Sequence, residues 1–117
     1  MSSSLSFCQG ETPLIQMSIQ YAGGGPVNVT GYTIVWVLTA KRGTPALVTK
    51  STTAGTLTIL LGPAGSIQWS LTSAETNALA AGSYAHEVHI KSPAPGSQQY
   101  CVLHGRVDVG ESSIGTI

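Results

Sequence analysis

The three histidines are the side chains in this sequence best suited to metal binding or acid–base chemistry. His86 and His89 lie three positions apart in a segment that alternates like a β-strand, so we expect them on opposite faces. They therefore cannot chelate one metal ion from a single strand. His89 could share a face with Glu87, and His104 could approach from a neighbouring strand. We expect surface or core-edge histidines rather than a metal site, with His86 partly buried and hydrogen-bonded.

Residues suited to nucleophilic or acid–base catalysis are present but scattered. No serine lies in a G-x-S-x-G turn, and the triple glycine at Gly23–Gly25 is followed by neither Lys-Ser/Thr nor a helix, so it is not a phosphate loop. The few carboxylates form no obvious pair: Glu11, Glu75, Glu87, Asp108 and Glu111. The sequence thus predicts a non-enzymatic protein with no catalytic residues, no metal ligands and no cofactor.

Cys8 and Cys101 are the only cysteines. They are interpreted as two buried thiols, and the alternative is a disulfide that ties the first strand to the last. Two cysteines without a nearby histidine pair make a poor zinc site. Trp36 and Trp69 fall inside predicted strands, where core packing is favoured over a sugar-stacking surface.

Composition limits the classes of partner. The chain has 117 residues, which suits one domain, and 42% of them are hydrophobic. Only 9% are charged and the formal net charge is +0, which argues against nucleic-acid binding and favours packing against neighbouring copies. The start has no signal-peptide pattern, and no stretch approaches the ~20 apolar residues of a membrane helix, so we expect synthesis in a cytoplasm and no membrane insertion.

Hydrophobic alternation predicts about seven short strands separated by turn residues. The segment 32–40 is apolar on both faces and is placed inside a sheet. In the last strand, 98–109, Cys101 is expected in phase with Leu103, Val107 and Val109. The expected strands span residues 12–21, 32–40, 46–51, 56–61, 66–72, 83–91 and 98–109.

One helical segment interrupts the strands between residues 73 and 81. Thr72 is the expected N-cap, Glu75 has the capping-box spacing, and Gly82 is expected as the C′ glycine. The helix would carry the chain from one sheet to the other and cover the open end with Leu79. These elements predict an all-β, immunoglobulin-like antiparallel β-sandwich of about seven strands with one short crossover helix. Residues 7–109 would form the domain, between a flexible segment 1–6 and a flexible tail 110–117.

The order of several motifs resembles a small immunoglobulin-like module of tailed bacteriophages, found at the N-terminus of upper baseplate proteins and as short virion proteins. The resemblance covers roughly residues 7–109 and includes a turn signal at Val27–Gly31, with Asn28 where an acidic residue is common. Its motifs are "FCQGETP", "GGGPVNVTGYTIVWVL", "GSIQWSLTSAETNALAAGSYAHEV" and "VLHGRVDV". The most specific positions are Trp69 to Thr72, Glu75, Thr76, Leu79, Gly82 and Tyr84.

The resemblance implies a structural part of a virion, in a tail, baseplate or neck or decorating a head. Such a protein would be made in the host cytoplasm and would assemble with copies of itself and other virion proteins. Because the chain ends at Ile117, a downstream receptor-binding domain is not expected, which favours an adaptor or decorating subunit. The chain ends could add to a neighbour's sheet edge. The alternative is a glycan- or cell-surface-binding module that uses loops at one end of the sandwich, 22–26, 41–45 and 92–97.

Overall fold

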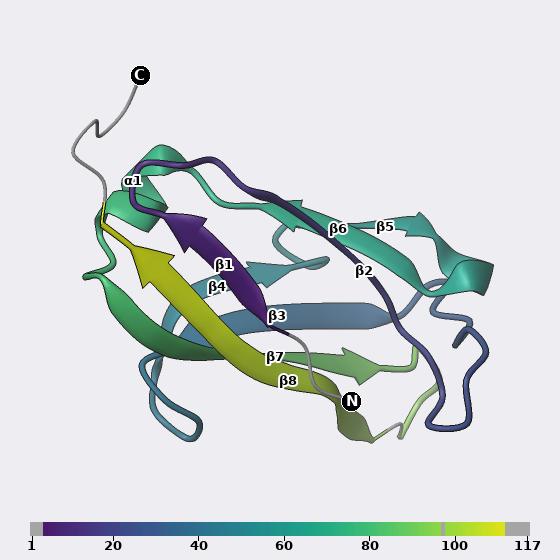
Figure 1. The fold of residues 1–117 in the computed structure, drawn as a ribbon. Coiled ribbons are helices and arrows are strands. Elements are labelled where there is room, and N and C mark those ends of the chain that lie inside the picture. Colours follow the sequence, from purple (N-terminus) through teal and green to yellow (C-terminus); the bar gives the residue numbers. More distant parts are fainter. Residues whose placement is uncertain (1–3, 97, 112–117) are drawn as a thin grey trace.

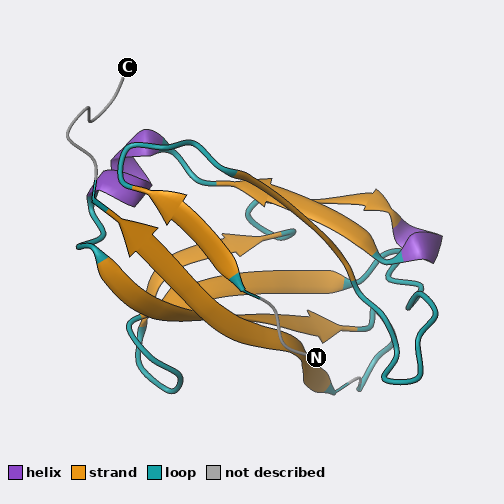
Figure 2. Cartoon of the chain, viewed as in Figure 1, coloured by secondary structure: helices purple, strands orange, loops and turns teal. Residues whose placement is uncertain are grey.

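The computed structural model describes residues 4–96 and 98–111. The described chain folds into eight strands in two sheets, with one short α-helix and one 3₁₀ turn (Figures 1 and 2). The elements are β1 (Leu5–Cys8), β2 (Leu14–Ser18), β3 (Thr33–Thr39), β4 (Ala46–Ser51), β5 (Leu57–Leu61), η1 (Gly62–Ala64), β6 (Ser66–Ser70), α1 (Ser73–Asn77), β7 (Gly82–Lys91) and β8 (Gln99–Gly110). The predicted mainly β architecture with one short helix is confirmed.

The larger sheet, sheet A, has the strand order β1-β8-β7-β3-β4 and curves into a half-barrel (Figure 1). Its pairs are antiparallel except one, because β1 runs parallel to β8, with Leu5 opposite Val107. The prediction of a purely antiparallel fold is therefore wrong: this sheet is mixed.

Strand β1 also lies partly inside the segment 1–6 that the sequence predicted to be flexible. Phe7 of β1 is buried in the core, and Leu5 packs against it. A four-residue strand next to a run of serines gives too short an alternation to be recognised from the sequence. At the other end, β8 extends to Gly110, the first residue of the predicted tail, while residues 112–117 lie outside the described residues.

The smaller sheet, sheet B, has the order β2-β6-β5 and packs against the concave side of sheet A. Trp69 of β6 meets Trp36 of β3 at the centre, with ring centroids 5.1 Å apart. Both indoles are almost fully buried, so the predicted core role of the two tryptophans is confirmed. The predicted strand 12–21 is shorter than expected, because only Leu14–Ser18 pairs with β6.

Helix α1 connects β6 of sheet B to β7 of sheet A, as the sequence predicted. Thr72 and Glu75 form the predicted capping box: Thr72 Oγ1 accepts from Glu75 N–H, and Glu75 Oε1 accepts from Thr72 N–H. The helix ends earlier than predicted, with Ala78 as its C-cap, and Leu79 is buried over the end of the core. Gly82 is not a helix C′ residue but the first residue of β7.

Strand β8 contains an irregularity that the alternation did not reveal. Val88 lies opposite Leu103, but His89 lies opposite Cys101, so Val102 is an extra residue between the two pairs. The extra residue reverses the phase of the strand. Cys101 consequently lies on the outer face of sheet A, whereas Leu103, Val107 and Val109 point inward as predicted.

Candidate functional site

The three histidines considered in the sequence lie on the two faces of sheet A. His86 is fully buried on the inner face, and its Nδ1 accepts a hydrogen bond of 3.0 Å from Trp36 Nε1. This bond requires a neutral ring with its proton on Nε2. The predicted hydrogen bonding of His86 is confirmed, but the side chain is fully rather than partly buried. His89 lies on the opposite face.

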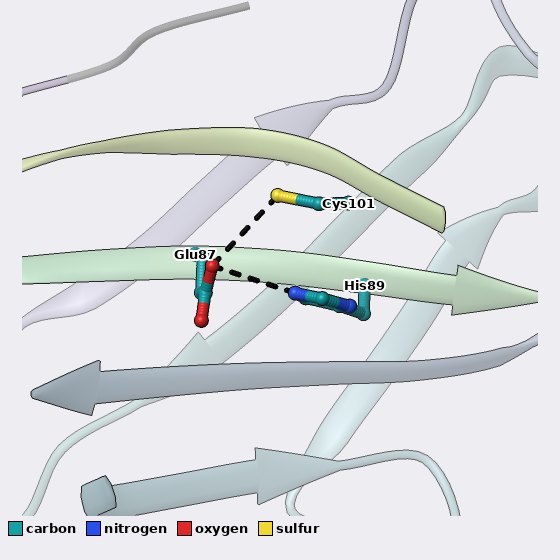
Figure 3. Close-up of side chains that lie close together, drawn as sticks. All are labelled: Glu87, His89 and Cys101. Carbon is teal, nitrogen blue, oxygen red and sulfur yellow. Dashed lines mark hydrogen bonds and ion pairs between the residues drawn. The ribbon is translucent and has the colours of Figure 1, made fainter. Parts of the chain in front are cut away.

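A polar cluster on the outer face of sheet A contains Glu87 and His89 of β7 and Cys101 of β8 (Figure 3). His89 Nε2 lies 3.4 Å from Glu87 Oε2, and Cys101 Sγ lies 3.9 Å from the same oxygen. The sequence predicted the shared face of Glu87 and His89 but placed His104, not Cys101, beside them. His104 lies opposite Glu87 in the strand register but is not a member of this close group.

Arg42 also faces this cluster from the turn after β3. Its Nε lies 3.8 Å from Glu87 Oε2, and one of its terminal nitrogens lies 4.0 Å from Cys101 Sγ. The Arg42 side chain is more than half exposed, so its positive charge lies at the solvent-facing rim of the cluster.

Both cysteines are free and exposed, so neither reading made from the sequence is correct. Cys8 lies opposite Gly110 near one end of β8, and Cys101 lies near the other end. At about 3.3 Å per strand residue, roughly 30 Å of strand separates them, far beyond the reach of a disulfide.

A partly buried ion pair joins helix α1 to β4. Lys50 Nζ donates to both carboxylate oxygens of Glu75, at 2.8 and 2.9 Å, and the Lys50 side chain is 9% exposed. Burial by itself would raise the pKa of Glu75, but the hydrogen bonds from Lys50 and from the Thr72 backbone outweigh it and hold the pKa below 4.5. The pair thus fixes the crossover helix against the edge of sheet A.

A second polar group on the outer face involves Arg106, Asp108 and Ser83. Arg106 Nε donates to Asp108 Oδ1 at 2.8 Å, and Ser83 Oγ donates to the same oxygen at 3.1 Å. These hydrogen bonds, that of Arg106 first, lower the pKa of Asp108. The group is open to solvent and resembles ordinary surface pairing rather than a reaction site.

Large apolar side chains are exposed on the strands at the sheet edges. Leu14 on β2, Leu47 on β4 and Leu60 and Leu61 on β5 are each between 47% and 61% exposed. Regular alternation along the predicted strand 56–61 would place Leu61 on the same face as Leu57. An irregularity between Ile59 and Leu61 instead places Leu61 opposite the outward-facing Ser66.

The edge strands differ in how well they are protected against pairing with another chain. Strand β4 contains an irregularity at Leu47 and an inward-pointing Lys50, and β5 contains an irregularity at Leu60. Strand β1 is only four residues long. Strand β2 pairs with β6 in unbroken register from Leu14 to Ser18 and carries no charge and no proline, and no described residue pairs with its outer side.

The three loops proposed for ligand binding do not lie at one end. Thr33 pairs with Lys91 at one end of sheet A, and Thr39 pairs with Ala85 at the other end. The 41–45 turn and the 92–96 turn therefore lie at opposite ends of the sheet. Residue 97 lies outside the described residues. A hollow of about 550 Å³ beside the glycine loop is lined by Gln20, Tyr21, Ala22, Gly24 and Val102, with the Tyr21 ring exposed.

Sequence reasoning missed the role of Cys101 and the exposed edge leucines. For Cys101, Leu60 and Leu61 the missing information is an extra residue in a strand, which is defined only against the neighbouring strand. Within residues 4–96 and 98–111, no helix is long and apolar enough to cross a membrane. No protein-family model matches the chain, and no curated protein matches its sequence.

Proposed function

We propose that this protein is a non-enzymatic structural subunit of a tailed-bacteriophage virion, with an immunoglobulin-like sandwich that assembles with copies of itself and with other virion proteins. The observation that carries the proposal is the outer edge of β2. It offers main-chain groups without a described partner on a regular strand that has no charged residue. Such an edge is suited to strand addition by another chain.

The exposed leucines of the same three-stranded sheet also favour contact with another protein. Leu14 lies on β2 itself, while Leu60 and Leu61 lie on β5 at the other edge of the same three-stranded sheet. Only 9% of the chain is charged, so little electrostatic repulsion opposes the approach of a second surface. The order of motifs resembles that of the phage module, and on this resemblance we propose that the assembly is a virion built in the host cytoplasm.

The proposed location in a virion is tested by immunolabelling of phage particles from the source, viewed by electron microscopy. Antibody against the recombinant protein is expected to label one position on the particle, in the head, neck, tail or baseplate. Intact particles that lack the protein, with the epitope accessible in the purified protein, would contradict a virion role.

A glycan- or cell-surface-binding module is the second candidate, and the hollow beside Tyr21 favours it. An exposed tyrosine ring next to a glycine-rich loop is a surface on which a sugar can stack. The substitution Tyr21→Ala separates the two functions, because it is expected to abolish binding on a glycan array and to leave particle assembly unchanged.

A further inference from the structure

We propose that Glu87, His89 and Cys101 form a binding site for a divalent transition-metal ion, with zinc as the favoured ion. The three side chains each offer one ligand atom, and these atoms all lie within 4.8 Å of one another (Figure 3). The site goes beyond the structural role proposed above and does not depend on it.

The donor set selects the class of metal. A thiolate sulfur and an imidazole nitrogen are preferred by zinc and its neighbours in the first transition row, whereas magnesium and calcium require oxygen ligands. Cysteine, histidine and glutamate are all regular zinc ligands. Three protein ligands leave a fourth tetrahedral position, which faces solvent and is available to water.

The geometry of the cluster is close to that of a bound site. Tetrahedral zinc with ordinary bond lengths separates its ligand atoms by about 3.3–3.6 Å. The separation of His89 Nε2 from Glu87 Oε2 is 3.4 Å, and that of Cys101 Sγ from the same oxygen is 3.9 Å. Small rotations of the three side chains on the paired strands β7 and β8 would therefore bring their ligand atoms to bonding distance from one ion.

The side chain of Gln99 supplies the outer support that metal-bound histidines usually have. Its amide nitrogen lies 3.0 Å from His89 Nδ1, the ring nitrogen that points away from Glu87. When a metal occupies Nε2, Nδ1 carries the proton, and a half-turn of the amide lets the Gln99 carbonyl oxygen accept it. Gln99 thus orients the ring in both states.

Arg42 is the group that opposes metal binding. Its guanidinium lies 3.8 Å from Glu87 Oε2, so it neutralises the carboxylate that the metal would use. Because its side chain is 57% exposed, Arg42 can turn into solvent when an ion enters. The charge of Arg42 therefore weakens metal binding, and its removal should strengthen it.

The test uses the full chain, freed of metal with a chelator, and titrates it with zinc by calorimetry and with cobalt by absorbance. We expect one ion per chain and a thiolate-to-cobalt charge-transfer band. The substitutions Cys101→Ser, His89→Gln and Glu87→Gln should each weaken binding by more than about tenfold, and Cys101→Ser should abolish the band. Arg42→Gln should strengthen binding.

Two matched variants distinguish this site from binding elsewhere. Cys8→Ser changes the other exposed cysteine, and His104→Gln changes the neighbouring histidine on the same face. Both should leave the affinity unchanged. Absence of stoichiometric binding by the folded wild type, weaker binding in Arg42→Gln, or a larger loss in either control than in Cys101→Ser would overturn the proposal.

Discussion

At the scale of single residues, the two core tryptophans have different partners although they touch each other. Trp36 Nε1 donates to His86 Nδ1, whereas Trp69 Nε1 is buried without a hydrogen-bond partner among the described residues. A buried N–H group without a partner has lost its hydrogen bonds to water and gained nothing in exchange. The two rings therefore contribute unequally to stability despite their similar burial.

This difference predicts unequal effects of the same substitution. Trp36→Phe and Trp69→Phe remove a similar volume, but only Trp36→Phe breaks a buried hydrogen bond. We expect Trp36→Phe to lower the free energy of unfolding by about 1–2 kcal/mol more than Trp69→Phe. Urea denaturation followed by far-ultraviolet circular dichroism measures both variants. Equal losses, or a larger loss in Trp69→Phe, would show that the Trp36–His86 bond contributes nothing net.

At the scale of elements, the crossover helix is held by an ion pair whose members are not equally buried. The Lys50 side chain is 9% exposed and that of Glu75 is 30% exposed. Neutralising Glu75 leaves a buried ammonium group without its counter-charge, whereas removing Lys50 leaves a carboxylate that solvent and the helix cap still stabilise. Glu75→Gln keeps the hydrogen-bonding shape of the capping box, so it isolates the effect of charge.

We expect Glu75→Gln to lower the free energy of unfolding by about 1–3 kcal/mol and Lys50→Met by about 1 kcal/mol or less. Because the pKa of Glu75 is lower in the folded protein than its ordinary 4.5, its stabilising contribution is complete above about pH 4.5. It is lost as the pH falls through the folded-state value. Urea denaturation at several pH values should show this loss in the wild type and a smaller one in Glu75→Gln. Identical pH profiles would contradict it.

The elements also show which structural features the sequence could predict. The capping box at Thr72 and Glu75 and the core position of Trp69 were predicted correctly, because both depend on residues close together in the chain. The outward position of Cys101 was not, because an extra residue at Val102 is defined only against the neighbouring strand. Two of the three members of the polar cluster, Glu87 and His89, were therefore predictable, and the third, Cys101, was not.

At the scale of the whole molecule, the relevant feature is the unequal protection of the sheet edges. Strand β4 has an irregularity and an inward lysine, while β2 has neither. A lysine on an edge strand is a common natural means of preventing pairing with another chain. The same substitution should therefore act differently at the two edges.

We expect Leu14→Lys on β2 to reduce self-association or binding to virion partners by at least about tenfold. Leu47→Lys on β4 is the matched control, since Leu47 has a similar exposure, and it should have little effect. Sedimentation velocity over a range of concentrations measures self-association, and incorporation into particles measures partner binding. Association that responds to Leu47→Lys and not to Leu14→Lys would move the proposed interface to the other sheet.

The pairing of β1 with β8 has a consequence for how the protein is made. On the ribosome β1 emerges early, but its partner strand ends at Gly110, so Phe7 cannot reach its buried position until almost the whole described chain has been synthesised. The other strands of sheet A can pair before that moment, because β3, β4 and β7 all precede β8. Pairing of β1 with β8 therefore closes a loop of about a hundred residues. During synthesis, β1 and its apolar side chains stay unpaired until β8 has been made.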